Sequence, residues 1–588
     1  MATAEQREQR IAQVQPQEVR EGLVAADTSV CVYPLGFTPE LKRKLVDSAA
    51  AWGLRVGRFS DVGKVLHESL IAFQEDRISF TGLFAAAALL DDAIKDGEQA
   101  YPKEIDFITH ALRTEEELAV MLARVSREPG SIEEHGRAIT EEGAREFHRK
   151  WTVSVEGYGH ASVAEHAIIH LAVEGIPSLD GDWVTDNRLA SFTEFSARFK
   201  GRQDVGYYTP DVVKQDPVLS ARWHQVHAML FELNDLLMVK GMGYIQTDEA
   251  RAKWPTRKVM TKTVADQMKN LLPASRLTSV GITLNARTAE HLIQKFLSSP
   301  YPSIRSLGSL IKEQSLRVAP TLVRYADRNE YLVAARRGIG QLAEETRFQG
   351  YIPEFREDRK PAVVLEADPR ADDKLIATAL FQDARTGSFG KLMELVGKMD
   401  LGEKRRVMEK LLGGLGTHDA PIRALEMPGD YIVDYPGMTY GDLREYKRHR
   451  IQSYYIKDLD VRWGYMIPPL AQEMDESSDP QFHGAVGAIK RVMGEVEGLF
   501  NAVYQVDPYT AHYCVTRLHY RPTVAKYNLR QGYHLWDLRT GPTAHPFIRR
   551  LMWPVLDQVK EVQPIIYEYL RLKMKQRIRP GPTYPWTF

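Results

Sequence analysis

The sequence predicts an α+β fold in which one structural unit occurs twice in tandem, as two diverged copies that follow an N-terminal extension. A set of short landmarks recurs in the same order in both halves of the chain, which predicts the duplication. Helical apolar periodicity is interleaved with few segments typical of strands, which predicts the α+β class. A chain of 588 residues is also too long for one hydrophobic core.

The most specific landmark is a motif near the end of each half. The first half reads N-A-R-T-A-E-H from Asn285, and the second reads N-L-R-Q-G-Y-H from Asn528. Upstream, D-N-R-L-A-S-F around Arg188 parallels R-H-R-I-Q-S-Y around Arg450, and each is followed by G-Y-x-x-P. After the motif, each half has an I-R pair and then a proline at the same separation: Ile304 and Pro320, and Ile548 and Pro564.

These landmarks divide the chain into four parts. Residues 1–103 match neither copy and form an N-terminal extension to which no role is assigned. Copy one occupies residues 104–340 and copy two occupies residues 362–588. Residues 341–361, which are rich in charge and carry two prolines, are the linker between them.

Helices are expected in equivalent places of the two copies. They are residues 284–299 and 303–325 in copy one, and residues 527–538 and 546–573 in copy two. In the last of these, apolar residues recur three and four apart and give one apolar face. Another helix is expected around Glu141–Glu156. The best strand candidates are W-V-T-D-N-R-L-A-S-F from Trp183 and Y-I-V-D-Y from Tyr431.

The composition is that of an ordinary globular protein, with 44% hydrophobic and 26% charged residues. A formal net charge of −1 gives no electrostatic reason to expect nucleic-acid or membrane binding. Cys31 and Cys514 are the only cysteines, which is too few for a disulfide framework or a Cys-based zinc site. The sequence shows neither an apolar signal core nor a membrane-length apolar run, so we expect a cytoplasmic protein.

The first candidate cluster is G-H-A-S-V-A-E-H-A-I-I-H, which begins at Gly159. His166 and His170 are four residues apart and would share a helix face, a spacing that can hold a metal. The H-E-x-x-H order of metallohydrolases is absent, and no further ligand set is evident. Packed or hydrogen-bonded histidines are the simpler explanation, and we predict no metal.

The second cluster is F-T-E-F-S-A-R-F, in which Glu194, Ser196 and Arg198 occupy alternate positions. Alternation places all three on one face if the segment is extended. A carboxylate, a hydroxyl and a guanidinium together suit a polar heterocycle that carries a phosphate. A solvated strand face is the alternative interpretation.

The third cluster is the pair of N-x-R-x-x-x-H motifs, in which arginine and histidine are four residues apart and share a helix face. The pairs are Arg287 with His291 and Arg530 with His534. Arg539 lies eleven residues after Asn528, close to three helical turns, so the two align if the helix persists. The motifs could form only a polar helix surface, but their recurrence in both copies favours a ligand.

The fourth cluster is K-R-H-R at residues 447–450. An arginine pair can hold a pyrophosphate by forked hydrogen bonds, although a surface charge run is the common explanation for such a tetrapeptide. The sequence G-G-L-G at Gly413 follows an expected helix rather than a strand, so we do not interpret it as a phosphate loop.

Together these segments resemble the flavin-dependent thymidylate synthases, which methylate dUMP with methylenetetrahydrofolate, FAD and a nicotinamide reductant. That family carries an R-H-R-I-A-S-Y-N-E-x-S-x-R-Y pattern, an upstream G-H-x-x-x-x-E-H, and a later N-A-R-x-x-x-[HN] helix that ends in L-R. The resemblance covers both copies and leaves residues 1–103 outside. It implies two tandem flavin-dependent thymidylate synthase-like units after an N-terminal extension.

The two copies depart from the family pattern in complementary ways. Copy one keeps the G-H…E-H cluster and the E-x-S-x-R set, but residues 186–188 read D-N-R in place of R-H-R. Its motif helix ends in Phe296, where the family has an arginine thought to hold the nucleotide. Copy two keeps R-H-R and Arg539 but lacks a recognisable E-x-S-x-R, and Arg423 stands near the expected place of the upstream glutamate.

The resemblance implies a composite site, because each active site of the family is assembled from several subunits of a homotetramer. Glu194, Ser196 and Arg198 of copy one would bind dUMP together with Arg539 of copy two, and Arg198, Ser196 and Arg539 would carry the catalysis. The residues implied in FAD binding are Ser126, His160, Ser162, Glu165, Arg188, Asn285, Arg287, His291, Arg448, His449, Arg450, Asn528, Arg530 and His534.

The activity implied is FAD-dependent methylation of dUMP to dTMP, with methylenetetrahydrofolate as methylene donor and NADPH as reductant. The protein would be a homodimer that forms a pseudo-tetramer of four units, with no nucleic-acid or membrane partner. Two alternatives remain open: a flavin- or nucleotide-binding relative without thymidylate synthase activity, or a scaffold that has lost its ligands.

Overall fold

The computed structural model describes residues 30–34, 114–124, 129, 135, 139–153, 161–195, 206–253, 257–345, 360–416, 419–541 and 544–569. The chain forms two compact units. One contains residues 27–195 and 277–350, and the other contains residues 1–26, 196–276 and 351–588. The middle of copy one, residues 196–276, therefore belongs to the compact unit that contains copy two. The copy boundaries drawn from the repeats remain predictions.

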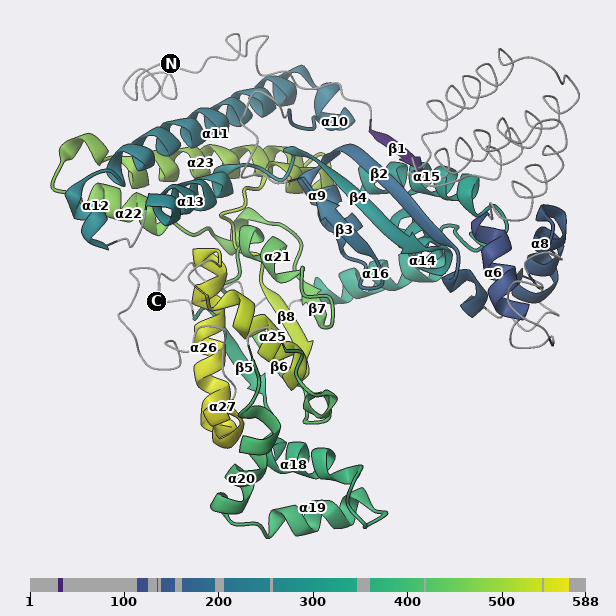
Figure 1. Cartoon of the computed structure of the whole chain (residues 1–588). Helices are drawn as coiled ribbons and strands as arrows, with labels where there is room; N and C mark the ends of the chain where they lie inside the picture. Colours follow the sequence, from purple (N-terminus) through teal and green to yellow (C-terminus); the bar gives the residue numbers. More distant parts are fainter. Residues whose placement is uncertain are drawn as a thin grey trace, which may run out of the picture. The chain divides into compact units, whose positions relative to one another are not determined.

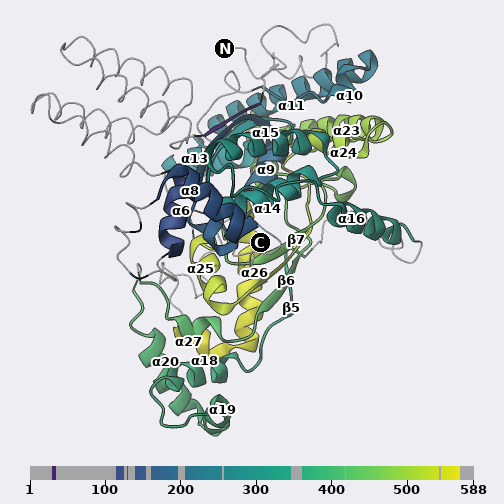
Figure 2. The ribbon, with the colours of Figure 1, turned by 90° about the vertical axis from the view of Figure 1, so that its right-hand side faces the viewer.

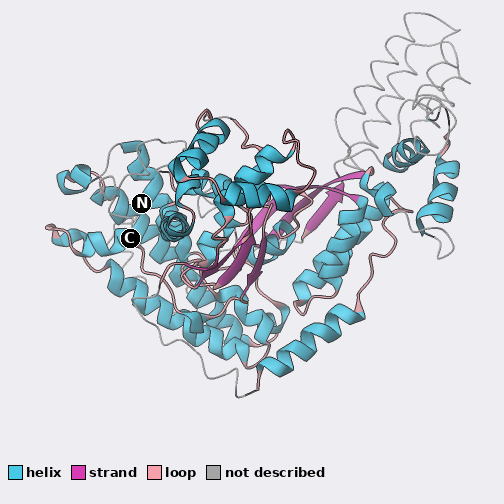
Figure 3. Cartoon of the chain, turned by 90° about the horizontal axis from the view of Figure 1, so that it is seen from below, coloured by secondary structure: helices cyan, strands magenta, loops and turns pink. Residues whose placement is uncertain are grey.

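The first unit is built on a four-stranded antiparallel sheet with the strand order β1-β2-β4-β3. The strands are β1 (Cys31–Pro34), β2 (Ile168–Pro177), β3 (Ser191–Glu194) and β4 (Leu277–Asn285). Strand β1 comes from within the N-terminal extension, so this part of the extension completes the sheet of copy one. In Figure 1 the long strands β2 and β4 run side by side, and Figure 3 shows helices around the strands of the chain.

Helices surround this first sheet. They are α6 (Glu115–Arg124), α8 (Glu141–Phe147), α9 (Ser178–Thr185), α14 (Ala286–Leu297), α15 (Pro302–Val318) and α16 (Glu330–Ala343), with a π-helical turn (His148–Val153) after α8 and a short 3₁₀ helix, η3 (Ala161–Glu165). Helix α14 packs on α15, and Figure 2 shows these two helices from the side. Helix α15 also contacts β1 and β2. The apolar face of α14 consists of buried residues three and four apart, namely Ala289, Leu292, Ile293 and Phe296.

The second unit repeats the same sheet topology, with the strand order β5-β6-β8-β7 and all pairs antiparallel. Its strands are β5 (Val363–Glu366), β6 (Tyr431–Tyr435), β7 (Ser453–Ile456) and β8 (Thr523–Tyr527). An identical strand order and pairing in both copies confirms the duplication that the sequence predicts. The motif asparagine follows the same central strand in each copy, β4 in copy one and β8 in copy two.

The second sheet carries its own helices, with equivalents of α9, α14 and α15. They are α18 (Ala371–Phe381), α19 (Phe389–Gly397), α20 (Leu401–Leu412), η6 (Arg423–Glu426), α21 (Tyr440–Tyr446), α25 (Leu529–Arg539), α26 (Pro546–Val562) and α27 (Pro564–Tyr569). Helix α25 packs on α26, and α26 also contacts β5. The core of this unit is aromatic, because Trp536 is fully buried and contacts the rings of Tyr431, Tyr527 and Tyr567 at centroid distances of 5.5–6.2 Å.

A layer of helices in the second unit combines residues of both copies. Copy one supplies α10 (Asp211–Lys214), α11 (Pro217–Tyr244), α12 (Asp248–Lys253), α13 (Arg257–Met268) and η5 (Lys269–Leu271). Copy two supplies η7 (Val461–Trp463), α22 (Pro469–Asp475), η8 (Pro480–Phe482), α23 (Ala485–Tyr504), α24 (Pro508–Ala511) and η9 (His512–Cys514). The long helices α11 and α23 pack against each other, as Figure 1 shows.

The helix predictions hold with one systematic difference. The helices predicted at residues 284–299 and 527–538 correspond to α14 and α25, but each of the following helices ends two residues before its matched proline. Ala319 and Gln563 precede those prolines and leave the helical conformation with φ values of −133° and −131°. Proline disfavours a helical residue before it, so the same break occurs in both copies. The helix expected around Glu141–Glu156 is formed as far as the structure describes it, by α8 and the π-helical turn.

One strand prediction is confirmed and the other is wrong. Y-I-V-D-Y forms β6. In W-V-T-D-N-R-L-A-S-F, the first three residues end helix α9, and only the last two belong to a strand, β3. The side-chain amide of Asn187 donates to the carbonyl oxygens of Trp183 and Val184 and so satisfies the last turn of α9. The β-like composition of the segment gave no sign of this capping contact.

The aromatic core of copy two makes the first prediction. Trp536→Ala should lower the free energy of unfolding by about 3–5 kcal/mol, because it leaves a cavity among three tyrosine rings. Tyr455→Ala is the matched control, since Tyr455 lies on β7 and is 88% exposed, and it should change stability by less than about 0.5 kcal/mol. Urea unfolding followed by tryptophan fluorescence and circular dichroism measures both, and equal midpoints would contradict the prediction.

Candidate nucleotide site

The motif asparagines have the same local role in both copies. The Asn285 side chain accepts a hydrogen bond from the Thr288 backbone N–H at 2.8 Å, and the Asn528 side chain accepts one from Gln531 at 2.9 Å. Each asparagine is therefore the N-cap of its helix, α14 or α25, which is a preferred position for this residue type. Helix capping accounts for the recurrence of the asparagines.

The motif arginines also have matching partners. Arg287 Nη1 lies 2.5 Å from Glu165 Oε1, and Arg530 Nη1 lies 2.6 Å from Glu426 Oε1. Both glutamates end a short 3₁₀ helix before the second strand of their sheet, η3 or η6. Glu426 is thus the copy-two counterpart of Glu165, whereas the sequence placed Arg423 near that position. The side chain of Arg423 is 92% exposed.

A cavity of about 400 Å³ opens beside the start of α25. It brings together three residues that the resemblance implied in cofactor binding, Asn528, Arg530 and His534. The remaining lining residues are Gly416, Asp419, Ala420, Pro421, Glu426, Ile451, Gln531, Tyr533 and Asp537. The volume falls in the range of small-molecule sites in proteins. The sequence prediction that Arg530 and His534 share one helix face is therefore confirmed, whereas Arg539, which was predicted to align with Asn528, does not line this cavity.

The Arg-His-Arg segment follows α21 and exposes its arginines while burying its histidine. Arg448 and Arg450 are exposed, and His449 is 4% exposed. His449 Nε2 accepts a hydrogen bond from Arg539 Nε at 2.9 Å, and its ring lies edge-on to that of His534. Burial, followed by the nearby Arg539 charge, lowers the pKa of His449 to about 3, so the ring is neutral. Its Nδ1 is buried without a hydrogen-bond partner among the described residues.

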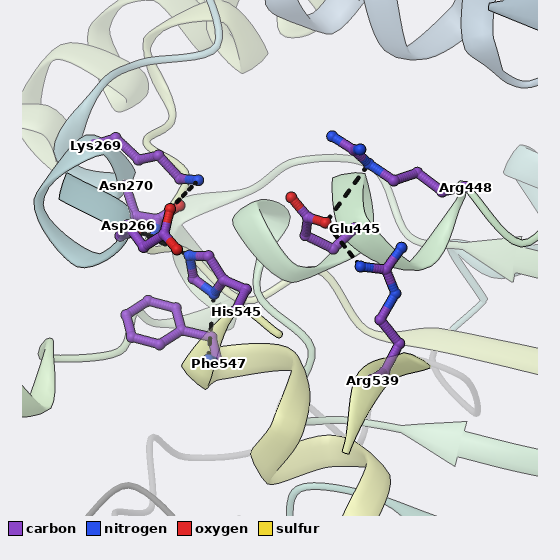
Figure 4. Close-up of polar contacts among 8 residues, drawn as sticks. All are labelled: Asp266, Lys269, Asn270, Glu445, Arg448, Arg539, His545 and Phe547. Atoms are coloured by element: carbon purple, nitrogen blue, oxygen red, sulfur yellow. Dashed lines mark hydrogen bonds and ion pairs between the residues drawn. The ribbon is translucent and has the colours of Figure 1, made fainter. Parts of the chain in front are cut away.

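Arg539, the last residue of α25, is held by a carboxylate of its own copy. Its Nη1 lies 3.1 Å from Glu445 Oε2, and the same oxygen lies 3.5 Å from Arg448 Nε. Figure 4 shows the carboxylate of Glu445 between these two guanidinium groups. Burial alone would raise the pKa of Glu445, but the surrounding positive charges, Arg448 foremost, lower it to about 2. Glu445 is therefore ionised at neutral pH.

Copy one contributes to the surroundings of this cluster. His545 Nε2 donates to the carbonyl oxygen of Asp266 at 2.9 Å, and the Asp266 carboxylate lies 3.1 Å from Lys269 Nζ. The backbone N–H of Phe547 donates to His545 Nδ1, which fixes the neutral tautomer of that ring. Figure 4 shows this group beside the Glu445 cluster. Asp266 and Lys269 belong to copy one, so both copies build this region of the second unit.

The equivalent position in copy one is apolar. Phe296 is fully buried and contacts Trp183 edge-to-face at a ring-centroid distance of 6.2 Å, and Tyr301 contacts the same tryptophan at 5.7 Å. Beside them, Lys295 Nζ lies 2.7 Å from Asp186 Oδ2. The loss of arginine at position 296 is thus accompanied by an aromatic core.

The other predicted residues of copy one lie on several elements of the first unit, as far as the structure describes them. Ser162, Arg188 and His291 are exposed. Glu194 ends β3, half-buried, and accepts a hydrogen bond from the Thr278 hydroxyl at 3.4 Å. Four predicted residues lie outside the described residues: Ser126, His160, Ser196 and Arg198.

The prediction that His166 and His170 share a helix face is wrong. His170 lies in strand β2, and its Nδ1 is 2.9 Å from the Thr283 hydroxyl on β4. The alternation of buried residues along Ile168–Pro177 shows why the segment forms a strand beside β4. Within the part of the chain that the structure describes, no cluster of three or more His, Cys, Asp or Glu side chains could hold a metal.

Besides Glu426 and Glu445, sequence reasoning missed two buried arginines that occupy equivalent positions in the two copies. Arg276 and Arg517 occupy matching S-R-L and T-R-L sequences, and each is 3% exposed. Burial, and then the charge of Arg517, lowers the pKa of Arg276 to about 10. The repeated R-L dipeptide was the available signal: it leads directly into β4 in copy one and lies before β8 in copy two. Among the described helices, none combines the length and apolar character that a bilayer crossing requires.

Comparison with known proteins places these features in a family. A model of the family described as "Thymidylate synthase complementing protein" matches residues 107–321 and 366–565. A UPF0159 protein of Thermoplasma acidophilum is 23% identical over 51% of this chain and 57% of its own length. A UPF0159 protein of Chlamydia muridarum is 21% identical over 73% of this chain and 81% of its own. A flavin-dependent thymidylate synthase of Thermococcus kodakarensis is 28% identical over 24% of this chain and 50% of its own.

Two solved structures are similar to part of the chain. A UMP/dUMP methylase of Streptomyces cacaoi, bound with 5-Br dUMP, is 15% identical with a TM-score of 0.27 and covers 35% of this chain and 93% of its own. A flavin-dependent thymidylate synthase of Helicobacter pylori, complexed with FAD and dUMP, is 15% identical with a TM-score of 0.21 and covers 34% of this chain and 89% of its own. Because the family model matches one long segment in each copy, and these segments together cover most of the chain, this protein belongs to the flavin-dependent thymidylate synthase family as a tandem duplication of its unit.

Proposed function

We propose that this protein methylates dUMP to dTMP with FAD, using methylenetetrahydrofolate as donor and NADPH as reductant. The observation that carries the proposal is the position of Arg539, at the end of the helix whose first turns line the cavity of copy two. One polar helix thus connects the cavity proposed for the cofactor to the arginine proposed for the nucleotide. Copy one has Phe296 at the same position.

The residues around the cavity fit part of a flavin dinucleotide. Its volume of about 400 Å³ suits one portion of such a ligand, and the lining offers amide, guanidinium and imidazole groups. Arg448 and Arg450 are exposed beside Ile451, which lines the cavity, and they are the proposed pyrophosphate ligands. His449 Nδ1 is a buried donor without a described partner, as expected where a ligand supplies an acceptor. FAD bound here would supply hydride chemistry.

The residues of this chain would bind and orient the nucleotide. In the proposed composite site, Arg198 and Arg539 hold the phosphate and uracil oxygens, and Glu194 and Ser196 position the ring. Fixed positive groups stabilise negative charge that develops on the ring, the role that oxyanion sites play in acyl transfer. This chemistry needs no cysteine nucleophile, and Cys514 is buried in surroundings that raise the pKa of its thiol well above the ordinary range.

A specific observation favours a second function, nucleotide or flavin binding without methylation. Arg539 is already paired with Glu445, and two relatives that each match 73% of this chain bear the name UPF0159 rather than an activity. The flavin absorbance of the purified protein separates either binding function from a scaffold without ligands. Formation of dTMP from dUMP, measured with all three co-reactants, then separates the enzyme from the binding protein.

Flavin retention gives the first functional prediction. Arg530→Ala should weaken FAD binding roughly tenfold or more, because a charged hydrogen-bonding group at the cavity is lost. Arg405→Ala is the matched control, since it breaks a bidentate arginine–glutamate pair with Glu568 on the surface of the same unit. Equal flavin occupancy in wild type and Arg530→Ala, measured by absorbance after gel filtration, would refute the assignment.

The oligomeric state gives the second functional prediction. We expect a dimer of two-copy chains, because family sites need neighbouring subunits and one chain supplies only two units. Sedimentation velocity at micromolar concentration measures the mass. A monomer that retains flavin would show that the pseudo-tetramer is not needed.

The composite site gives the third functional prediction. Arg198→Ala and Arg539→Ala should each weaken dUMP binding, and the double variant should lose less than the sum of the two, because residues that contact one ligand are coupled. Calorimetric titration of dUMP into the four proteins measures the coupling. Strictly additive losses would mean that the two arginines do not share a nucleotide.

A further inference from the structure

The same two positions of the fold contact each other in copy one and in copy two. Glu445 lies on α21, three residues before the Arg-His-Arg segment, and Trp183 lies on α9, three residues before the matching Asp-Asn-Arg. Arg539 and Phe296 each lie eleven residues after a motif asparagine. Glu445 contacts Arg539, and Trp183 contacts Phe296. The contact is thus a property of the fold, and its chemistry differs between the copies.

The partners at these positions match each other in each copy. In copy two they are a carboxylate and a guanidinium, with side chains 11% and 15% exposed. In copy one they are two aromatic rings in an edge-to-face contact. An acid with a base, or a ring with a ring, satisfies a largely enclosed contact, whereas a lone charge there would be costly. Arg539, which the proposed function assigns to the nucleotide, is therefore paired with Glu445 of the same chain.

We propose that Glu445 determines the affinity of the nucleotide site, because its carboxylate is paired with the guanidinium group of Arg539, to which an anionic ligand would bind. This inference rests on the proposed function and identifies a residue that works against tight dUMP binding. A ligand oxygen that accepts the Arg539 Nη1 hydrogen now donated to Glu445 takes the place of Glu445 Oε2. The ligand then gains only the difference between two charged hydrogen bonds rather than the whole of one.

The contacts allow this exchange. The Nε of Arg539 donates to His449, so the guanidinium stays oriented when its Nη1 changes partner. The displaced carboxylate is not left without a counter-charge, since its Oε2 also lies 3.5 Å from Arg448 Nε. The side chain of Arg448 is 64% exposed, so the pair can move toward solvent together.

Titration of dUMP into wild type, Glu445→Gln, Arg539→Gln and the double variant tests the proposal. Glu445→Gln preserves the shape of the side chain and removes its charge, and it should tighten dUMP binding by about tenfold. The double variant should lose this gain, because the gain acts through Arg539. An unchanged or weaker affinity in Glu445→Gln would overturn the proposal and would make the carboxylate a support for the arginine.

Glu568→Gln is the matched control. It removes the same unit of charge from the same compact unit and breaks the surface pair with Arg405, so it separates a local effect from a change in net charge. We expect its dUMP affinity to equal that of wild type. A gain as large as that of Glu445→Gln would overturn the proposal.

A second measurement needs no nucleotide and therefore separates this proposal from the proposed function. Phenylglyoxal modifies accessible arginines, and the rate at Arg539 can be followed by peptide mass spectrometry in wild type, Glu445→Gln and Glu445→Asp. We expect faster modification in Glu445→Gln and a rate near that of wild type in Glu445→Asp, which keeps the charge. Faster modification in Glu445→Gln without any dUMP binding would reject the proposed function and would retain only the pairing of Glu445 with Arg539, with another anion as the ligand. Equal rates in all three proteins would reject the proposal even if dUMP binds.

Discussion

The pairing of Arg530 with Glu426 anchors the polar surface of copy two. It joins the first turn of α25 to the short helix before β6, and the same pairing of Arg287 with Glu165 joins α14 to the segment before β2. Antiparallel pairing makes this contact possible, since the end of β8 lies opposite the start of β6. The helix therefore starts at a fixed place. Everything farther along α25, from the cavity to Arg539, is positioned by that start.

Divergence between the copies acts at the other end of the same helix. Copy one has a buried phenylalanine against a tryptophan, and copy two has an arginine that contacts a glutamate and a neutral histidine. A core contact of this kind cannot change one partner at a time without burying a lone charge or leaving a cavity. The two solutions are therefore alternatives, and this chain carries the apolar one in copy one and the charged one in copy two.

The sequence predicted features that depend on local rules. The helical state of α14 and α25 follows from neighbouring residues and was predicted. The asparagine caps and the breaks before the matched prolines also follow from neighbouring residues, but they were not predicted. The partners of the arginines did not follow, because Glu426 and Glu445 are 104 and 94 residues away from the arginines that they bind. The segment of His170 was assigned to a helix because four-residue spacing also fits one face of a strand.

Residues 196–276 of copy one belong to the compact unit of copy two, so the two copies depend on each other for hydrogen-bond partners. His545 of copy two donates to Asp266, the Leu470 backbone N–H donates to the Gln267 side chain, and the Arg517 backbone N–H donates to the Leu272 carbonyl. Most of these groups are buried, so separating the copies would leave several polar groups without partners, each at a cost of roughly 1–3 kcal/mol. Copy two would also lose Asp266 and Lys269 from beside the Glu445 cluster. The arginine site of copy two is in this sense a product of both copies, because residues of copy one complete the enclosure in which its charges are paired.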